Sequence, residues 1–174
     1  MAEWPSPSGS PAALDQVCAA ADARHQRVRV NLANVTRLLE AVAGDGPPAP
    51  ELVAQFEDLA AFLERHCTRE EQILWPALEA LADAARQGQP RPPLPFPTML
   101  HPVRLMEGEH AGLRERLDRL RQVTQRSASS DVGGERWRNV CEGLAALDAA
   151  VVDHVRFENE VLFPLALVVE SELT

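Results

Sequence analysis

The segment HVRFENEVLFPLAL, residues 154–167, sets a histidine and a glutamate within an otherwise apolar, helix-forming stretch. A similar segment, HCTREEQILWPAL, occupies residues 66–78. In both segments the glutamate follows the histidine by four residues, and an aromatic residue and a proline come after it. Because residues four apart share one face of a helix, each histidine points the same way as its glutamate. The repeat predicts two helices that each direct an imidazole and a carboxylate toward the same place.

Around these two segments, apolar residues recur at steps of three and four, which is the period of a helix buried on one face. The pattern covers four stretches: 13–43, 51–86, 98–126 and 135–170. Proline- and glycine-rich connections separate them at 44–50, 87–97 and 127–134. No stretch alternates as a strand would. We therefore expect an all-α fold, an up-down-up-down four-helix bundle over residues 13–172, after a disordered tail at 1–12.

Each of the four apolar stripes contains one histidine, and two stripes add a glutamate. The six polar residues are His25, His66, Glu70, His110, His154 and Glu158. Their order along the chain is a lone histidine, a His–Glu pair, a second lone histidine and a second pair. This order predicts two similar helical hairpins that bring all six groups to a pseudo-twofold axis in the core.

A lone histidine on an apolar stripe is more often a satisfied core residue than a ligand, so the two glutamates carry the argument. Burying a carboxylate without a partner costs several kcal/mol. The chain has no lysine to neutralise it, because all 17 basic residues are arginine. The nearby Arg69 and Arg156 point away from the stripes. Two unpaired carboxylates that face four histidines therefore require a cation.

The ligand count and type indicate which cation. Four imidazoles and two carboxylates are too many for a single four-coordinate zinc, and calcium or magnesium prefer oxygen alone. Mixed nitrogen and oxygen ligands favour iron, with manganese and zinc as alternatives. If both glutamates bridge two metals, each metal receives two histidines and two carboxylate oxygens. A shared oxo or hydroxo group then leaves one position on each iron for dioxygen, nitric oxide, peroxide or azide.

Composition excludes several other classes of function. The net charge of −9 argues against a nucleic-acid partner. The absence of lysine excludes Schiff-base chemistry, and the absence of tyrosine excludes a tyrosyl radical. Three cysteines without paired spacing, an N-terminus unlike a signal peptide and no apolar run free of charges predict a cytoplasmic protein without a membrane partner.

The segments HCTREEQILWPAL, LMEGEHAGL and HVRFENEVLFPLAL, with His25 in ADARHQRV, resemble the hemerythrin-like (HHE cation-binding) domain family over about residues 13–170. Oxygen-carrying hemerythrins have a fifth histidine four residues from the one on the third helix, where this chain has Met106 and Arg114. The ligand set is instead similar to that of the repair-of-iron-centres proteins. Carried over residue by residue, that resemblance implies a symmetric di-iron site with four histidines and two bridging glutamates. The six ligands would be His25, His66, Glu70, His110, His154 and Glu158.

The resemblance implies a non-haem di-iron protein that binds small oxidants or diatomic ligands and protects against oxidative or nitrosative stress. Repair of damaged iron–sulfur proteins is the role it indicates. The alternatives are a dioxygen or nitric oxide sensor or carrier without turnover, a peroxidase-like or nitric-oxide-reducing enzyme, and a structural bundle with incidental zinc. Trp75 and Phe163 are expected to cover the site, and the following prolines to kink or end their helices. Glu71, Glu107, Glu109 and Glu160 lie off the stripes, at the surface or behind the histidines.

Overall fold

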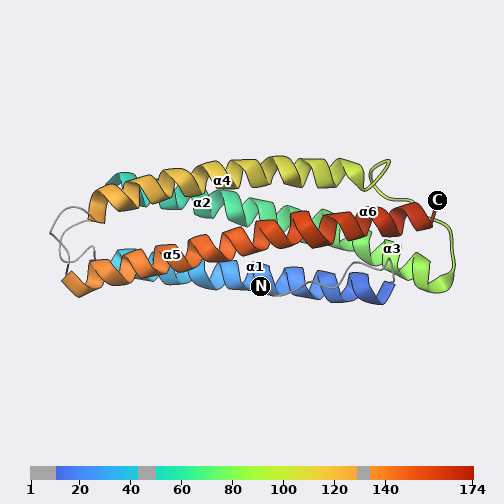
Figure 1. Cartoon of the computed structure of the whole chain (residues 1–174), viewed down its shortest axis with the longest axis horizontal. Helices are drawn as coiled ribbons and strands as arrows, with labels where there is room; N and C mark the ends of the chain where they lie inside the picture. Colours follow the sequence, from blue (N-terminus) through green and yellow to red (C-terminus); the bar gives the residue numbers. More distant parts are fainter. Residues whose placement is uncertain (1–10, 43–49, 129–133) are drawn as a thin grey trace.

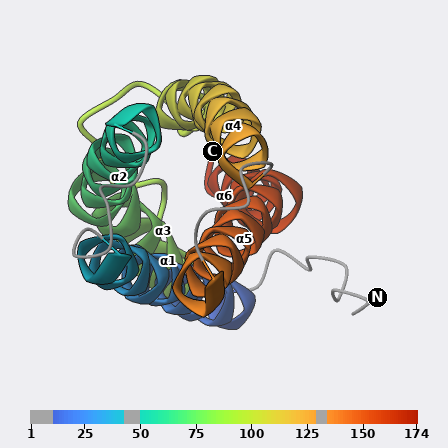
Figure 2. The same cartoon turned by 90° about the vertical axis from the view of Figure 1, so that its left-hand side faces the viewer.

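The computed structural model describes residues 11–42, 50–128 and 134–174, which are mostly helical and contain no strand. Four antiparallel rods run up and down along one long axis (Figure 1), as expected for a four-helix bundle. The rods are α1 (Pro11–Val42), the run α2 (Pro50–Arg69), η2 (Glu70–Leu74) and α3 (Trp75–Gln87), then α4 (Leu100–Ala128), and the run α5 (Gly134–Phe157), η3 (Glu158–Leu162) and α6 (Phe163–Glu172). Seen end-on, the rods surround a shared core (Figure 2).

The expected connections at 44–50 and 127–134 and the expected tail at 1–12 fall largely outside the described residues, and α1 already begins at Pro11. Within the part of the chain that is described, α1 packs mainly on α5, and α2 packs mainly on α4. Gly143 permits the close approach of α5 to α1, because a Cβ at that position would lie 2.7 Å from Leu38 Cδ1. No described helix is both long and apolar enough to cross a lipid bilayer.

Two hydrophobic clusters fill the bundle, one toward each end. One contains residues such as Val35, Leu59, Leu117 and Leu147, and the other contains residues such as Leu14, Leu78, Val103 and Leu165. On each rod a histidine stands at the junction of the two clusters; on α1, for example, it lies between Ala21 and Val28. The polar groups are thus enclosed between two dry layers near the middle of the bundle.

The rod α2–η2–α3 and the rod α5–η3–α6 each contain one turn of π-helix, which begins at the glutamate of the repeated segment. The N–H of Trp75 bonds to the carbonyl of Glu70, and the N–H of Phe163 bonds to that of Glu158. A proline follows each aromatic residue and supplies no N–H of its own, which favours a wider turn over a regular one. Neither helix ends at its proline; both continue, as α3 and α6. Such π-turns are frequent at functional sites.

The predicted proline-rich linker is confirmed as a non-helical segment between α3 and α4, and it is held against α6. Gly88 ends α3 with φ 62°, a left-handed conformation that glycine adopts without strain. Beyond it, Arg91 Nε donates to Glu170 Oε1 at 2.7 Å. The same carboxylate accepts from the N–H of Met99 at 2.8 and 3.0 Å, just before α4 begins. Glu170 therefore ties the linker and the start of α4 to α6.

We expect Glu170→Ala to lower the free energy of unfolding by about 2 kcal/mol, because it removes a helix cap and leaves a buried N–H without an acceptor. Urea denaturation of the variant would measure the loss. Glu172→Ala, a change at an exposed carboxylate of the same helix, is the matched control. Equal stability of the two variants would contradict this role of Glu170.

Candidate metal centre

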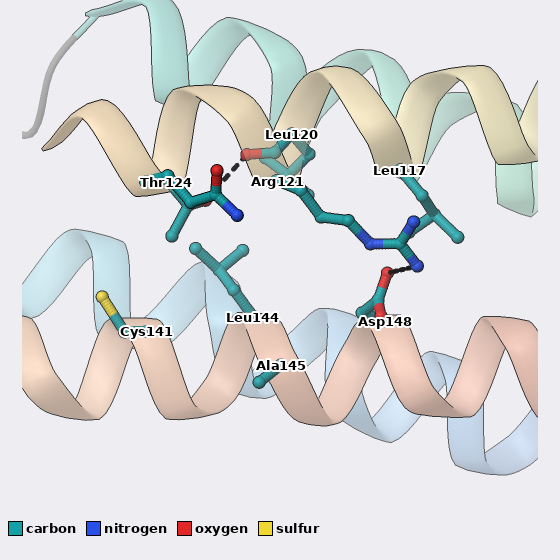
Figure 3. Close-up of a pocket in the computed structure, with 9 residues that line it drawn as sticks. Leu117, Leu120, Arg121, Thr124, Cys141, Leu144, Ala145 and Asp148 are labelled. Atoms are coloured by element: carbon teal, nitrogen blue, oxygen red, sulfur yellow. Dashed lines mark hydrogen bonds and ion pairs between the residues drawn. The ribbon is translucent and has the colours of Figure 1, made fainter. Parts of the chain in front are cut away.

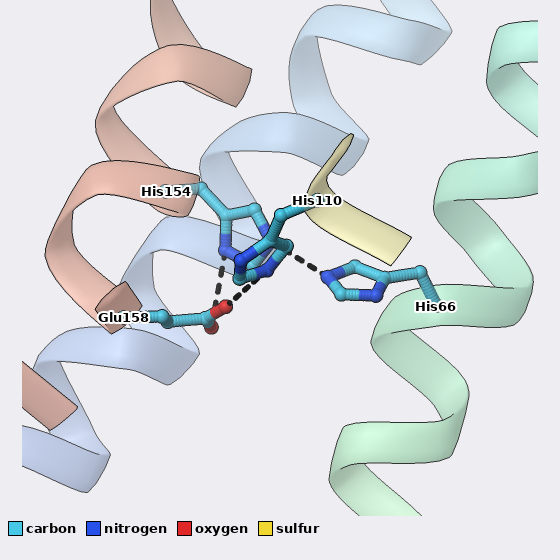
Figure 4. A group of neighbouring side chains, drawn as sticks. All are labelled: His66, His110, His154 and Glu158. Carbon is cyan, nitrogen blue, oxygen red and sulfur yellow. Dashed lines mark hydrogen bonds and ion pairs between the residues drawn. The ribbon is translucent and has the colours of Figure 1, made fainter. Parts of the chain in front are cut away.

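The six polar residues of the repeated pattern meet between the two hydrophobic clusters, and all are buried. Their exposed fractions are at most 1%. They come from every rod: His25 on α1, His66 on α2, Glu70 on η2, His110 on α4, His154 on α5 and Glu158 on η3. Figure 4 shows His66, His110 and His154 pointing from three helices toward one another and toward Glu158. Helical spacing alone places each histidine beside the glutamate four residues later. The packing of the bundle then brings the two His–Glu pairs together.

The carboxylates lie within reach of several ring nitrogens. Glu158 is 3.1 Å from His110 Nε2, 3.2 Å from His154 Nδ1 and 3.4 Å from His25 Nε2. Glu70 lies 3.1 Å from His25 Nε2. Neither oxygen of Glu70 has a hydrogen-bond partner of acceptable geometry, and the same holds for Oε1 of Glu158. Buried, unsatisfied carboxylate oxygens that converge with imidazole nitrogens form a site suited to a cation.

The surroundings of the two carboxylates shift their pKa values in opposite directions. Burial, and then repulsion from Glu158, raises the pKa of Glu70 well above its usual range. Burial acts in the same direction on Glu158, but the nearby imidazoles of His154, His110 and His25 outweigh it and lower its pKa. Further positive charge in the cluster would favour ionisation of both carboxylates.

The histidines also differ strongly from one another. Burial lowers the pKa of His66 to about 2, with the charges of His154 and His110 acting in the same direction. For His25 burial also opposes the charge, but the adjacent carboxylates of Glu158 and Glu70 outweigh it and raise its pKa to about 10. A neutral imidazole is the form that binds a metal, so His66 is ready to act as a ligand.

Three of the four histidines direct their second ring nitrogen to an acceptor outside the cluster. The acceptor is Glu71 for His25, Glu109 for His66 and Asn159 for His110, each at 2.9 Å. Such contacts set the tautomer and the orientation of a metal-binding imidazole. Glu71 is in turn held by Arg29, and Glu109 by Arg69.

His154 breaks this pattern. The acceptor of His66 is Glu109, the residue directly before His110. In the repeat, His154 corresponds to His66 and His25 corresponds to His110. The acceptor for His154 would therefore be the residue directly before His25. That residue is Arg24, which donates to the carbonyl of Ala20 and pairs with Asp153. His154 instead turns Nδ1 toward Glu158 and Nε2 toward His66 Nε2, at 3.2 Å in both cases. The two halves of the centre are therefore similar but not equivalent.

Two aromatic rings cover the cluster, as the sequence predicted. Trp75 stacks on His25 with ring centroids 5.1 Å apart, and Phe163 stacks on His110 at 5.6 Å. Each aromatic residue thus covers the lone histidine of its own hairpin. The rings restrict water at the cluster and leave the imidazole edges free to face inward.

In the described part of the chain, three groups of ligand atoms lie close enough together to surround a cation, and two of them consist of histidine and glutamate alone. One is His66, His110, His154 and Glu158; the other is His25, Glu70, His154 and Glu158. Within each group the atoms lie within 4.8 Å of one another. All six predicted residues enter one group or the other, and Glu158 and His154 enter both. The donor set of nitrogen and carboxylate oxygen fits iron.

Sequence reasoning did not anticipate two neighbours of this cluster. The Cys67 sulfur lies within 4.8 Å of ring nitrogens of both His25 and His154. Burial raises the pKa of its thiol. Asn159 was not singled out either, and the signal that could have found it is its place one residue after Glu158, where the first half has Glu71.

Comparison with known proteins shows the family of the chain. Residues 19–166 match the model of the Hemerythrin HHE cation binding domain. Curated relatives include the iron-sulfur cluster repair protein YtfE of Yersinia pseudotuberculosis and that of Yersinia pestis. Each is 28% identical over 145 residues, which are 83% of this chain and 60% of the relative, so the chain spans less than two thirds of these relatives. The family match covers most of the bundle, and the chain belongs to the hemerythrin HHE cation-binding family.

Proposed function

We propose that the chain is a non-haem di-iron protein. The proposed ligands are His25, His66, Glu70, His110, His154 and Glu158. The observation that carries the proposal is the burial of two carboxylates among four imidazoles, with oxygen atoms that have no hydrogen-bond partner. A pair of cations would neutralise both carboxylates, and two overlapping groups of ligand atoms suit two ions better than one.

The proposed activity is the binding of small oxidants or diatomic molecules, namely dioxygen, nitric oxide or peroxide, in protection against oxidative and nitrosative stress. Bound iron would supply redox chemistry and open coordination positions for such molecules. The protein's own residues hold the rings in place through Glu71, Glu109 and Asn159 and limit water through Trp75 and Phe163.

Repair of iron–sulfur clusters is the biological role that we favour, with damaged iron–sulfur proteins as partners. It is supported by the name of the YtfE relatives, of which this chain spans 60%. A cytoplasmic location and the absence of a nucleic-acid partner stay predictions from the sequence.

Metal analysis combined with optical spectra tests this proposal. The spectra are recorded before and after reduction, and after exposure to dioxygen, peroxide and nitric oxide. We expect close to two irons per chain and rapid oxidation, as ligand count and donor type indicate. A stable dioxygen complex would favour a carrier or sensor without turnover. Zinc as the only metal, with no response to any of the three molecules, would contradict the proposal.

Glu109 should strengthen metal binding by holding His66. Glu109→Leu removes the acceptor, and we expect iron affinity to fall about tenfold or more, with Glu109→Gln intermediate because its amide oxygen still accepts a hydrogen bond. Competition with a chelator would measure the affinities. Glu107→Leu, at an exposed carboxylate two residues earlier, is the control. Wild-type affinity in Glu109→Leu would show that this contact does not support the metal.

A further inference from the structure

Two apolar hollows follow one another along the seam between α4 and α5. The hollow farther from the histidines has a volume of about 210 Å³ and includes Leu120, Cys141 and Leu144 in its wall (Figure 3). Arg121 bridges the seam there to Asp148 at 2.7 Å. The second hollow has a volume of about 200 Å³. Both include Leu117 in their walls, so the apolar seam continues from one hollow to the next.

The second hollow, which we call the seam hollow, adjoins the metal centre. The apolar part of its wall is formed by Leu113, Leu117, Val151, Val152 and Val155. Arg114 and the ion pair of Arg156 with Glu160 also line it. Asn159 belongs to the same wall, and its Oδ1 accepts from Nδ1 of His110 at 2.9 Å. His110 itself is fully buried. The side chain of Asn159 therefore contacts both the seam hollow and a candidate metal ligand.

The matching seam in the first half of the repeat is closed by charge. Arg29, four residues after His25, bridges from α1 to two carboxylates of the neighbouring rod. It donates to Glu71 at 2.7 and 3.1 Å, and its Nε lies 3.6 Å from Glu64. These contacts hold a guanidinium across the seam at the level of the metal centre.

The second half retains the arginine but not its partners. Arg114, four residues after His110, is the counterpart of Arg29, and it is exposed at the lining of the seam hollow. Val152 and Asn159 occupy the positions that correspond to the two carboxylates. Val152 is 45% exposed. The loss of both negative charges leaves this seam without the ion pairs that close the other one.

We propose that the seam hollow admits a small uncharged diatomic molecule, such as nitric oxide or dioxygen, to the centre. The inference rests on the proposed function and assigns its access route. An apolar wall favours an uncharged molecule over an anion, and apolar cavities of about 150 Å³ bind xenon or benzene. The pair of hollows concentrates such a molecule next to Asn159, whose side chain lies between the seam hollow and His110.

A third hollow is less suited to this role. It has a volume of about 290 Å³ and lies between α1 and α3. Asp15, Asp22 and Glu79 line it, together with apolar residues such as Leu14 and Leu78. Where it approaches the centre, it meets Trp75, whose ring stacks on His25. A large side chain therefore closes it toward the metal ligands.

The first test restores the missing charge. Val152→Glu provides Arg114 with the counterpart of Glu64 and should close the seam hollow. With the reduced, iron-loaded protein, we expect nitric oxide to associate and dissociate about tenfold more slowly at an unchanged equilibrium constant, since a blocked route affects both directions equally. Stopped-flow absorbance would measure both rates. Val168→Glu, the same change at an exposed valine on α6, is the control.

The second test does not depend on iron. Crystals of the metal-free protein under xenon pressure should show xenon in the seam hollow, and Leu117→Phe should remove it by filling the space. Unaltered nitric oxide rates in Val152→Glu, or no xenon in the wild-type hollow, would overturn the access route. If the loaded protein failed to bind nitric oxide at all, the proposed function would fail, while the xenon experiment would still decide whether the hollow accepts a small apolar molecule.

Discussion

Glu70→Ala and Glu158→Ala are each expected to leave about one iron or less per chain, against about two in the wild-type protein. The reason is that each carboxylate lies among several histidines and would bridge two cations, so its loss weakens both positions. Glu158 should have the larger effect, because its oxygens lie within 3.4 Å of ring nitrogens from three histidines. Iron analysis after desalting would measure the change.

Glu160→Ala is the matched control for the iron content. Glu160 lies on the same π-turn as Glu158, but its side chain is 54% exposed and pairs with Arg156. The control should bind iron like the wild type. If both bridging variants retained full iron, the assignment of Glu70 and Glu158 as ligands would be wrong, even if the histidines were correct.

Removal of the metal is expected to lower the free energy of unfolding by about 4 kcal/mol at a metal concentration 1,000 times the dissociation constant. The buried carboxylates cause this dependence, because without a cation they stay unsatisfied in a dry core. Glu70→Met should therefore have opposite effects in the two states. It should stabilise the metal-free protein by about 1 kcal/mol and abolish most of the stabilisation that iron provides.

Urea denaturation of metal-free and iron-loaded samples would test both the gain in stability without iron and the loss of stabilisation by iron. Glu160→Ala should behave like the wild type in each state, because its carboxylate is exposed to water. A metal-free Glu70→Met protein less stable than the metal-free wild type would mean that Glu70 is satisfied without a cation. The two buried carboxylates would then not require positive ions.

The helices and the polar cluster could be predicted because both depend on spacing along one chain. A histidine and a glutamate four residues apart must share a helical face. The repeat of that pair, followed each time by an aromatic residue and a proline, predicted the two hairpins. The π-turns were not predicted. They add a residue to one helical turn at Glu70 and Glu158. Apolar residues spaced by three and four do not reveal a single wider turn.

The acceptors behind the histidines could not be assigned from the sequence. Glu107 and Glu109 lie on the same helix, both away from the apolar stripe, yet only Glu109 reaches His66. The choice depends on where α2 packs against α4, and no local pattern encodes that contact. The position of Cys67 depends on the same kind of contact. It lies on α2, whereas the two histidines near it, His25 and His154, lie on α1 and α5.

The sequence by itself determined that this protein is a helical bundle with four imidazoles and two carboxylates directed inward, because helical periodicity assigns each side chain to a face. Only the tertiary structure decided that the two halves differ. Arg29 closes one seam through Glu71 and Glu64, whereas Arg114 faces Val152 and Asn159 across a hollow. That difference arises from pairs of residues on separate helices, and such pairs become neighbours only when the helices pack.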